Sequence, residues 1–306
     1  EGHQRPAIPA RADNGPAPQS HAQQRLWFLD RLEGGSTAYH LAGEWQLTGQ
    51  LDQQALQHSL DDLAARHDNL RTVFAEDDQQ QGIQHVLEPR PVPVMVHDLS
   101  GEPDPDAALN RLNRTLVHQP MSLESGPLWR AHLVRLGEQD HRLLLVIHHI
   151  IADGWSVQVL VKEFAGLYKA RVEGQASDLP DLPIRYTDYA HWQRSLLASG
   201  EGERQLNWWK VQLGEEQPVL TLPADRPRPD AQSHRGARVA FQFPADLSER
   251  LRALAREQGV TLFMLMLALY KTQLYRYSGQ RDLRVAVPVA GRGRPETEGL
   301  VGLFVN

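Results

Sequence analysis

The chain has 306 residues, of which 41% are hydrophobic and 23% charged, and these fractions are ordinary for a globular protein. Its net charge of -6 is spread along the chain without a basic cluster, which argues against a nucleic-acid partner. The absence of cysteine excludes disulfides, thiolate metal sites and a cysteine nucleophile, and it fits a reducing cytoplasm. No apolar run is long enough to span a membrane, so we expect a cytoplasmic protein without a membrane partner.

Both ends of the chain are interpreted as cut from a longer protein. Residues 1–19 are polar, contain proline and are poor in large apolar groups, which is the composition of an inter-domain linker. The chain begins at Glu1 without a signal-peptide pattern, and residues 302–306 have the composition of a strand rather than of a polar tail. We expect ordered structure to begin near Ser20.

Apolar periodicity and turn residues divide the first half of the chain into helices and strands. The predicted elements are, in chain order, a helix over 22–32, a strand over 44–47, a helix capped by Asp52 and ending near 66, an extended segment over 70–74, and a hairpin of strands 128–136 and 142–148. After Asp153-Gly154 the apolar period changes from that of a strand to that of a helix, which predicts a helix over 157–168.

The second half of the chain alternates helices with shorter apolar segments. Its predicted elements are helices over 189–196 and 206–213, a strand over 237–243, a short helix at 251–254, a largely buried helix over 262–277 and a strand over 283–289. Proline-rich connectors lie at 179–184 and 218–229. A mixed α/β pattern with a connector in the middle predicts two lobes, over residues 20–180 and 181–306.

Two adjoining histidines, His148 and His149, lie at the predicted strand-to-helix turn and precede Asp153-Gly154. Histidine and aspartate are good metal ligands. Neighbouring side chains of a strand point to opposite faces, however, so the two imidazoles would not converge on one ion. No third histidine lies at helical spacing, and we expect no metal site.

Two interpretations of this turn then remain. In the first, the histidine is a hydrogen-bonded structural residue and Asp-Gly is only a turn. In the second, one histidine faces a cleft and acts as an acid–base catalyst, because an unperturbed imidazole titrates at about pH 6.5. Asp153 would then fix the turn by pairing with a basic group, and the N–H groups that start the following helix would hold an oxyanion.

The segment His148-His149-x-x-x-Asp153-Gly154 resembles the signature of condensation domains, which are related to chloramphenicol acetyltransferase. Further segments resemble motifs of the same family and occur in the family's order: 20–29, 66–74, 186–192 and 301–306. Asp68 stands where glutamate is commoner in the second of these motifs. The chain therefore resembles a condensation domain of a nonribosomal peptide synthetase, of the type that joins an L-configured donor to an L-configured acceptor.

This resemblance implies a fold of two chloramphenicol acetyltransferase-like α/β lobes in a V-shaped arrangement, with the second lobe incomplete at its C-terminal end. It implies that His149 is the catalytic residue, either as a general base or as a group that holds the neutral amine in line. It implies a supporting role at the site for His148, Asp153, Gly154, Arg66, Arg71 and Trp155. Arg66 is expected to pair with Asp153.

The same resemblance implies substrates held on phosphopantetheine arms of an upstream donor and a downstream acceptor carrier domain, with an adenylation domain adjacent. No tightly bound cofactor is expected, and no cofactor-binding residue is assigned. A heterocyclising relative would carry paired aspartates in place of the tandem histidines. The alternatives are an epimerisation domain, which shares the histidine motif, a coenzyme A-dependent acyltransferase, and a non-catalytic docking module that recruits partner enzymes.

Overall fold

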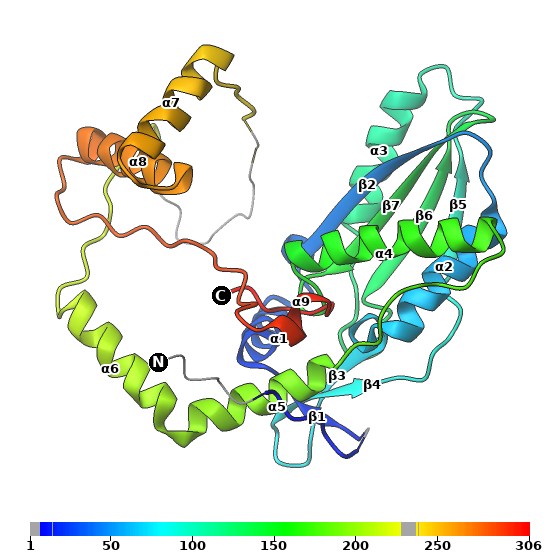
Figure 1. Cartoon of the computed structure of the whole chain (residues 1–306), viewed down its shortest axis with the longest axis horizontal. Helices are drawn as coiled ribbons and strands as arrows, with labels where there is room; N and C mark the ends of the chain where they lie inside the picture. The colour runs from blue at the N-terminus through cyan, green and yellow to red at the C-terminus, as the bar shows by residue number, and fades with distance from the viewer. Residues whose placement is uncertain (1–6, 14, 228–236, 238) are drawn as a thin grey trace. The chain divides into compact units, whose positions relative to one another are not determined.

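The computed structural model describes residues 7–13, 15–227, 237 and 239–306. The chain forms two compact units, of which the first comprises Glu1–Glu203 with Pro288–Asn306 and the second Arg204–Val287. Helices and strands both occur, so the predicted mixed α/β class is confirmed (Figure 1). The two predicted lobes, dividing after residue 180, stay a prediction; residues 181–203 pack with the first unit.

A four-stranded sheet with the order β2-β7-β6-β5 forms the centre of the first unit (Figure 1). Its strands are β2 (His40–Thr48), β5 (Val94–Asp98), β6 (Trp129–Arg135) and β7 (Asp140–His148). β6 and β7 form the predicted antiparallel hairpin, whereas β5 runs parallel to β6. β7 lies between β2 and β6 and is almost wholly buried along its second half, which gives its last residue a rigid support.

Helices cover both faces of this sheet. α2 (Gln53–Arg66) packs against α4 (Gly154–Val172) on one face. Phe164 of α4 and Trp45 of β2 both pack against the larger of two apolar clusters, which is the main core of the first unit. α3 (Pro105–Val117) lies on the opposite face, because its Asn113 donates to Glu44, which neighbours Trp45 and points the other way. The predicted cap of α2 is present, since the Asp52 carboxylate accepts from the Ala55 N–H over 2.9 Å.

The N-terminal segment packs against the first unit, which corrects the expectation that order begins near Ser20. β1 (Ala17–Pro18) pairs with β4 (Gly82–Val86), which in turn pairs with β3 (Thr72–Glu76). Ile8 is 4% exposed and lies in a second apolar cluster with Tyr189. Residues 1–6 and 14 of the predicted linker lie outside the described residues. The inter-domain linker over 1–19 stays a prediction.

The C-terminal segment is buried without forming the predicted strands. Leu303 joins the main core, and Phe304 packs edge-on against Tyr186 of α5 (Tyr186–Leu196). Val289 and Asn306 exchange two backbone hydrogen bonds of 2.8 and 2.9 Å, but residues 283–289 and 302–306 are otherwise irregular. A strand needs a continuous ladder with a partner, and one bonded pair does not supply it.

The remaining helices of the first unit are α1 (His21–Glu33), which confirms the predicted helix, and the short α9 (Pro295–Glu298). A 3-10 turn over Asp68–Arg71 precedes β3, so the predicted extended segment begins later than expected. A π-turn over Leu197–Glu201 leads to α6 (Gly202–Leu213), which belongs to the second unit from Arg204 onward. No helix among the described residues is both long and apolar enough to cross a membrane.

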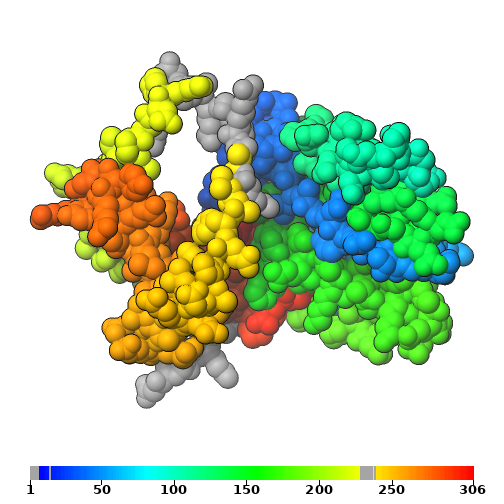
Figure 2. Space-filling view, turned by 90° about the horizontal axis from the view of Figure 1, so that it is seen from above, coloured from blue at the N-terminus to red at the C-terminus, as the bar shows by residue number. Residues whose placement is uncertain are grey.

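The second unit contains α7 (Ala245–Glu257) and α8 (Leu262–Ser278), which contact each other (Figure 2, orange). The predicted burial of α8 is wrong, since only Leu274 among its described residues is buried while Phe263 is 58% exposed. The predicted strand over 237–243 is also wrong, because its described residues are irregular and Phe241 is 78% exposed; residue 238 lies outside the described residues. Apolar pattern alone does not create the partner that a strand or a buried helix face requires.

Candidate active site

The turn that carries the predicted catalytic histidine joins the sheet to helix α4. β7 ends at His148, and the Asp153 carboxylate caps α4. Two backbone hydrogen bonds close the turn, from the Ile151 N–H to the His148 carbonyl over 3.1 Å and from the Ala152 N–H to the His149 carbonyl over 3.4 Å. The predicted succession of strand, tight turn and helix is therefore confirmed, and it holds the histidine on two rigid elements.

His149 is half-buried, and the backbone of its own turn fixes its ring. Its Nδ1 lies 2.8 Å from the carbonyl oxygen of Ala152. A carbonyl oxygen only accepts hydrogen bonds, so Nδ1 carries the proton of the neutral imidazole. Nε2 then keeps its lone pair. The main chain of His149 is held as well, since its N–H donates to the Tyr39 carbonyl over 2.8 Å.

His148 is 1% exposed and has a different chemistry from its neighbour. Its Nδ1 accepts from the Ile150 N–H over 3.1 Å, so the ring proton of the neutral form is on Nε2. Its ring lies edge-on to His40 with 5.7 Å between centroids. Burial, followed by the nearby His40 and His149, lowers the pKa of His148 to about 3. His148 is neutral at physiological pH, and its position in the core fits the supporting role expected of it.

Asp153 is buried, and both of its carboxylate oxygens are occupied. Oδ1 accepts from the Ser156 N–H over 2.8 Å and from the Ser156 hydroxyl over 2.7 Å. Oδ2 accepts from the Phe304 N–H over 3.1 Å. The Asp153 side chain thus caps α4 and ties it to the C-terminal segment. Because the cap already occupies an N–H of the first helical turn, this end of α4 is less open to an oxyanion than the sequence suggests.

The cationic partner of Asp153 is Arg292, and the expected pair between Arg66 and Asp153 is wrong. The Arg292 Nη2 lies 3.1 Å from Asp153 Oδ1, and both side chains are at most 3% exposed. Nη2 also donates to the Ser156 hydroxyl over 2.9 Å, and the guanidinium lies over the Phe304 ring at 4.1 Å. Burial lowers the pKa of Arg292, and the Asp153 carboxylate opposes that shift.

Arg66 contacts α4 farther along the helix, in an ion pair of its own. Its Nε donates to Glu163 over 3.1 Å, and its Nη2 donates to the Pro180 carbonyl over 2.6 Å. His67 approaches the same Glu163 oxygen at 2.7 Å. Arg66 therefore joins α2 to α4 and to the connector at Pro180. It supports the site only through the position of α4.

Arg71, Gly154 and Trp155 form no hydrogen bond with His149 in the described part of the chain. Arg71 pairs with Asp68 and donates to the Leu87 carbonyl. Gly154 has open space where a Cβ would stand and does not need a left-handed backbone. Trp155 is 42% exposed, and its Nε1 donates to the Glu298 carbonyl over 3.0 Å, which holds α9 against the start of α4.

Segments recognised separately in the sequence meet in one place behind the His149 turn. The Ser20 hydroxyl lies 2.9 Å from the Tyr186 hydroxyl, which donates to the Leu303 carbonyl. Gln23 accepts from the Ser20 N–H over 2.9 Å and reaches the Ile150 carbonyl at 3.5 Å. These contacts join the motifs at 20–29, 186–192 and 301–306 to the turn. The motifs therefore form one structural assembly around His149.

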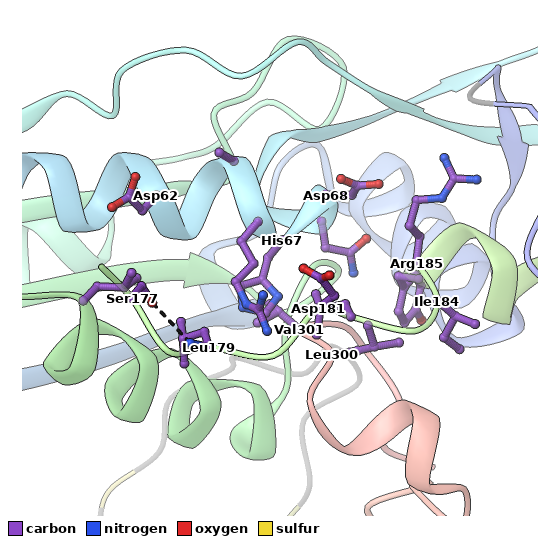
Figure 3. A pocket seen from close by; sticks show the side chains of 16 residues that line it. Asp62, His67, Asp68, Ser177, Leu179, Asp181, Ile184, Arg185, Leu300 and Val301 are labelled. Atoms are coloured by element: carbon purple, nitrogen blue, oxygen red, sulfur yellow. Dashed lines mark hydrogen bonds between the residues drawn. The ribbon is translucent and has the colours of Figure 1, made fainter. Parts of the chain in front are cut away.

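A pocket of about 610 Å³ opens beside this assembly, and His149 is not among its lining residues. Figure 3 shows lining side chains from three segments: His67 and Asp68 after α2, Leu179 and Asp181 on the connector that follows α4, and Val301 on the C-terminal segment. Its acidic and basic side chains are mixed, and the pocket adds no group to the proton chemistry of His149.

The residues that sequence reasoning missed are Arg292 and Ser156. Ser156 was part of the recognised segment without an assigned role, although its hydroxyl also accepts from the Gly302 N–H over 3.0 Å. A buried aspartate requires a cationic partner, so the sequence could have predicted that an arginine pairs with Asp153. It contains several arginines, however, and nothing in it shows which of them lies close to Asp153. Among the described residues no group of three or more histidine, aspartate or glutamate side chains has the geometry to hold a metal ion.

The Condensation domain family matches residues 14–306. A linear gramicidin synthase protein from Brevibacillus parabrevis is 44% identical over 303 residues, which are 98% of this chain and 4% of that protein. Chondramide synthase cmdD of Chondromyces crocatus is 44% identical over 94% of this chain and 7% of its own length. Phosphinothricin tripeptide synthetase PhsC of Streptomyces viridochromogenes is 41% identical over 98% of this chain and 28% of its own length. The chain thus spans a minor part of these relatives.

Solved structures agree with this match. The X-domain from teicoplanin biosynthesis is 30% identical, with a TM-score of 0.84, over 98% of this chain and 66% of that one. The first condensation domain of the CDA synthetase shares the fold, with a TM-score of 0.80 at 22% identity over 96% of this chain and 70% of that one. The family match, which covers nearly the whole chain, and the tandem histidines at the turn before α4 lead to one conclusion: this chain belongs to the condensation domain family.

Proposed function

We propose that the chain catalyses amide-bond formation between two carrier-bound substrates. The α-amine of an aminoacyl acceptor attacks the carbonyl carbon of an aminoacyl or peptidyl thioester, the C–S bond breaks, and the released thiol takes up the proton that the amine loses. The observation that carries this proposal is the His149 ring, whose Nδ1 is fixed 2.8 Å from the Ala152 carbonyl so that Nε2 keeps its lone pair.

The chemistry of an amine nucleophile suits this tautomer. An α-amino group titrates at about pH 8, so it is largely protonated at neutral pH and must lose a proton in order to attack. His149 Nε2 takes this proton or accepts a hydrogen bond that holds the neutral amine in line. General-base help contributes about 10²–10⁴ in rate, and the orientation of two tethered reactants contributes further. A thioester is already activated, so no covalent intermediate with the chain is required.

The substrates arrive, in this proposal, on the phosphopantetheine arms of an upstream donor and a downstream acceptor carrier domain, next to an adenylation domain. The support is that the relatives are synthetases far longer than this chain, and that a four-domain nonribosomal peptide synthetase shares the fold at a TM-score of 0.83 and 27% identity. The cytoplasmic location and the preference for an L-configured donor and acceptor, expected from the sequence, belong to the same proposal.

The second candidate function is a docking module without catalysis. It is favoured by one observation, the likeness to the teicoplanin X-domain, which is 30% identical and of which a complex with OxyB is known, at a TM-score of 0.83. A docking surface does not require a particular tautomer of a single histidine. The fixed ring of His149 and the fully bonded Asp153 therefore favour the catalytic proposal.

The test is transfer between two loaded carrier domains, followed by intact-protein mass spectrometry, with the longer protein that contains this chain. We expect the acceptor carrier to gain the donor's acyl mass, and His149→Gln to lower the rate by about 10²–10⁴, the range of general-base help. His118→Gln is the matched control, because the Nδ1 of His118 also lies on a carbonyl oxygen, that of Arg114 at 2.7 Å, but on the exposed end of α3.

Each alternative has its own outcome in this experiment. Carriers that bind without transfer, with wild type and variant alike, would replace the catalytic proposal with the docking module. A change of α-carbon configuration without transfer would identify an epimerisation domain. Transfer from free acyl-coenzyme A in place of the carrier would identify the coenzyme A-dependent acyltransferase.

A further inference from the structure

The tautomer of His149 depends on the orientation of a short stretch of backbone. The ring is fixed by the Ala152 carbonyl, and the peptide group that precedes it joins Ile151 to Ala152. The carbonyl of that preceding peptide, Ile151 O, accepts a hydrogen bond of 3.3 Å from the side-chain Nδ2 of Asn69. Asn69 comes from the 3-10 turn after α2, far from the His149 turn in sequence.

Asn69 is well placed to hold this peptide group. Its side chain belongs to a residue that is 1% exposed, so water does not easily take over its bond. The side chains next to it point elsewhere, since Leu70 packs in the main core and Asp68 pairs with Arg71. Asn69, by contrast, forms its hydrogen bond with the His149 turn.

The chemistry of the amide fixes which of its atoms faces the turn. If the amide were turned over, its oxygen would face the Ile151 carbonyl oxygen, and two acceptors would repel each other. In the orientation observed, Nδ2 donates to Ile151 O, and Oδ1 is buried without a partner among the described residues. A buried oxygen without a hydrogen bond lowers the stability of the fold, so an apolar side chain of similar size would fill this position better. The hydrogen bond from Nδ2 to Ile151 O is therefore what an asparagine provides here.

We propose that Asn69 is a positioning residue for the condensation reaction: it holds the Ile151–Ala152 peptide so that the Ala152 carbonyl keeps the proton of His149 on Nδ1. This inference rests on the proposed function for its effect on rate, but its effect on the tautomer stands independently. Without the Asn69 bond the peptide group keeps only the long bond of 3.4 Å from the Ala152 N–H to the His149 carbonyl, and its Ile151 carbonyl rotates toward another donor. The Ala152 carbonyl then leaves Nδ1, and Nε2 acquires the proton in a fraction of the molecules.

The variant that isolates the hydrogen bond is Asn69→Leu, which keeps the volume of the side chain and removes the donor. We expect its kcat to fall by at least tenfold and by no more than about 10⁴, the upper limit of general-base help, with little change in KM. Asn69→Ala is the second variant. Asn69 borders the pocket of about 610 Å³, so its truncation lets water reach Ile151 O and donate in its place.

The order of these two variants distinguishes positioning from packing. A packing role makes alanine the more damaging change, because it leaves a cavity. The positioning role makes leucine the more damaging change for kcat, because it excludes the water that replaces the amide. Asn113→Leu is the matched control: Asn113 also donates through Nδ2, to Glu44, and its Oδ1 is also without a partner among the described residues, but it lies on α3.

The direct readout is the tautomer of His149, measured by ring-¹⁵N NMR of the histidine-labelled chain and assigned by the signal that disappears in His149→Gln. We expect the Nδ1–H form in the wild type and in Asn113→Leu, and a mixture with the Nε2–H form in folded Asn69→Leu. An unchanged tautomer in folded Asn69→Leu, or a kcat lower in alanine than in leucine, would overturn the proposal. If the wild type transfers no acyl group, the proposed function fails, while the NMR result still decides the role of Asn69.

Discussion

Replacement of Arg292 by methionine is expected to destabilise the first unit by about 3–5 kcal/mol, the usual cost of leaving one member of a buried ion pair without its partner. Methionine keeps much of the length of the side chain and its contact with the Phe304 ring. It removes the charge opposite Asp153, together with the bonds that Arg292 donates to the Thr297 and Leu300 carbonyls. The loss is therefore one of charge and hydrogen bonds rather than of volume.

The magnitude follows from the geometry of the pair. Two unit charges 3.1 Å apart attract each other by about 5 kcal/mol at an effective dielectric constant of about 20. The cost of burying the Arg292 charge offsets part of this attraction, and that cost disappears in the variant. The Asp153 carboxylate keeps its bonds to Ser156 and to the Phe304 N–H, which limits the damage. We therefore expect the lower end of the range, about 3 kcal/mol.

The assay is a double-mutant cycle by urea unfolding, followed by the fluorescence of the tryptophans. Asp153→Asn combined with Arg292→Met should show a coupling energy of about 2 kcal/mol, because each residue is the other's partner. Asp153→Asn combined with Arg66→Met should be additive within about 0.5 kcal/mol, since Arg66 pairs with Glu163. Coupling of Asp153 to Arg66 with none to Arg292 would refute the assignment and restore the pair that the sequence suggested.

Two further predictions concern buried titratable groups. Glu163→Gln is expected to lower the free energy of unfolding by about 2 kcal/mol at pH 7, because Arg66 and His67 lose their anionic partner. Burial by itself raises the pKa of Glu163, but its hydrogen bonds and ion pairs with His67 and Arg66 outweigh burial, and the pKa is lowered from its usual 4.5. This contribution is therefore fully present above pH 4.5 and is lost as the pH falls through the folded-state pKa; a difference between the two proteins that does not shrink as the pH is lowered from 5 to 3 would contradict the reasoning. The pKa of His148 is lowered from 6.5 to about 3, so the histidine is neutral in both the folded and the unfolded chain above pH 6.5. Below that pH only the unfolded chain takes up the proton, and the free energy of unfolding falls by about 2 kcal/mol by pH 5. In His148→Gln, whose side-chain oxygen still accepts from Ile150, the unfolding free energy should depend less on pH between 7 and 5; equal slopes for both proteins would show that His148 is not the group that titrates.

Local pattern was sufficient where a structure depends on near neighbours in the chain. The cap at Asp52, the hairpin of β6 and β7 and the helix after the histidine turn follow from periodicity and from side chains three residues away. The order of motifs also identified the family, and it placed His149 at the turn before α4. The same pattern failed over 237–243 and 283–289, because strands require partners that local periodicity does not supply.

Only the tertiary structure decided which groups meet. Several arginines were available to a buried aspartate, and the fold selected Arg292 because the C-terminal segment, with Phe304 and Leu303, packs beside α4. It likewise gave the two adjoining histidines opposite tautomers, since one ring meets the Ala152 carbonyl and the other meets the Ile150 N–H. A sequence names the residue types that such a site needs, whereas ion pairs and tautomers depend on contacts a few ångströms long between atoms far apart in the chain.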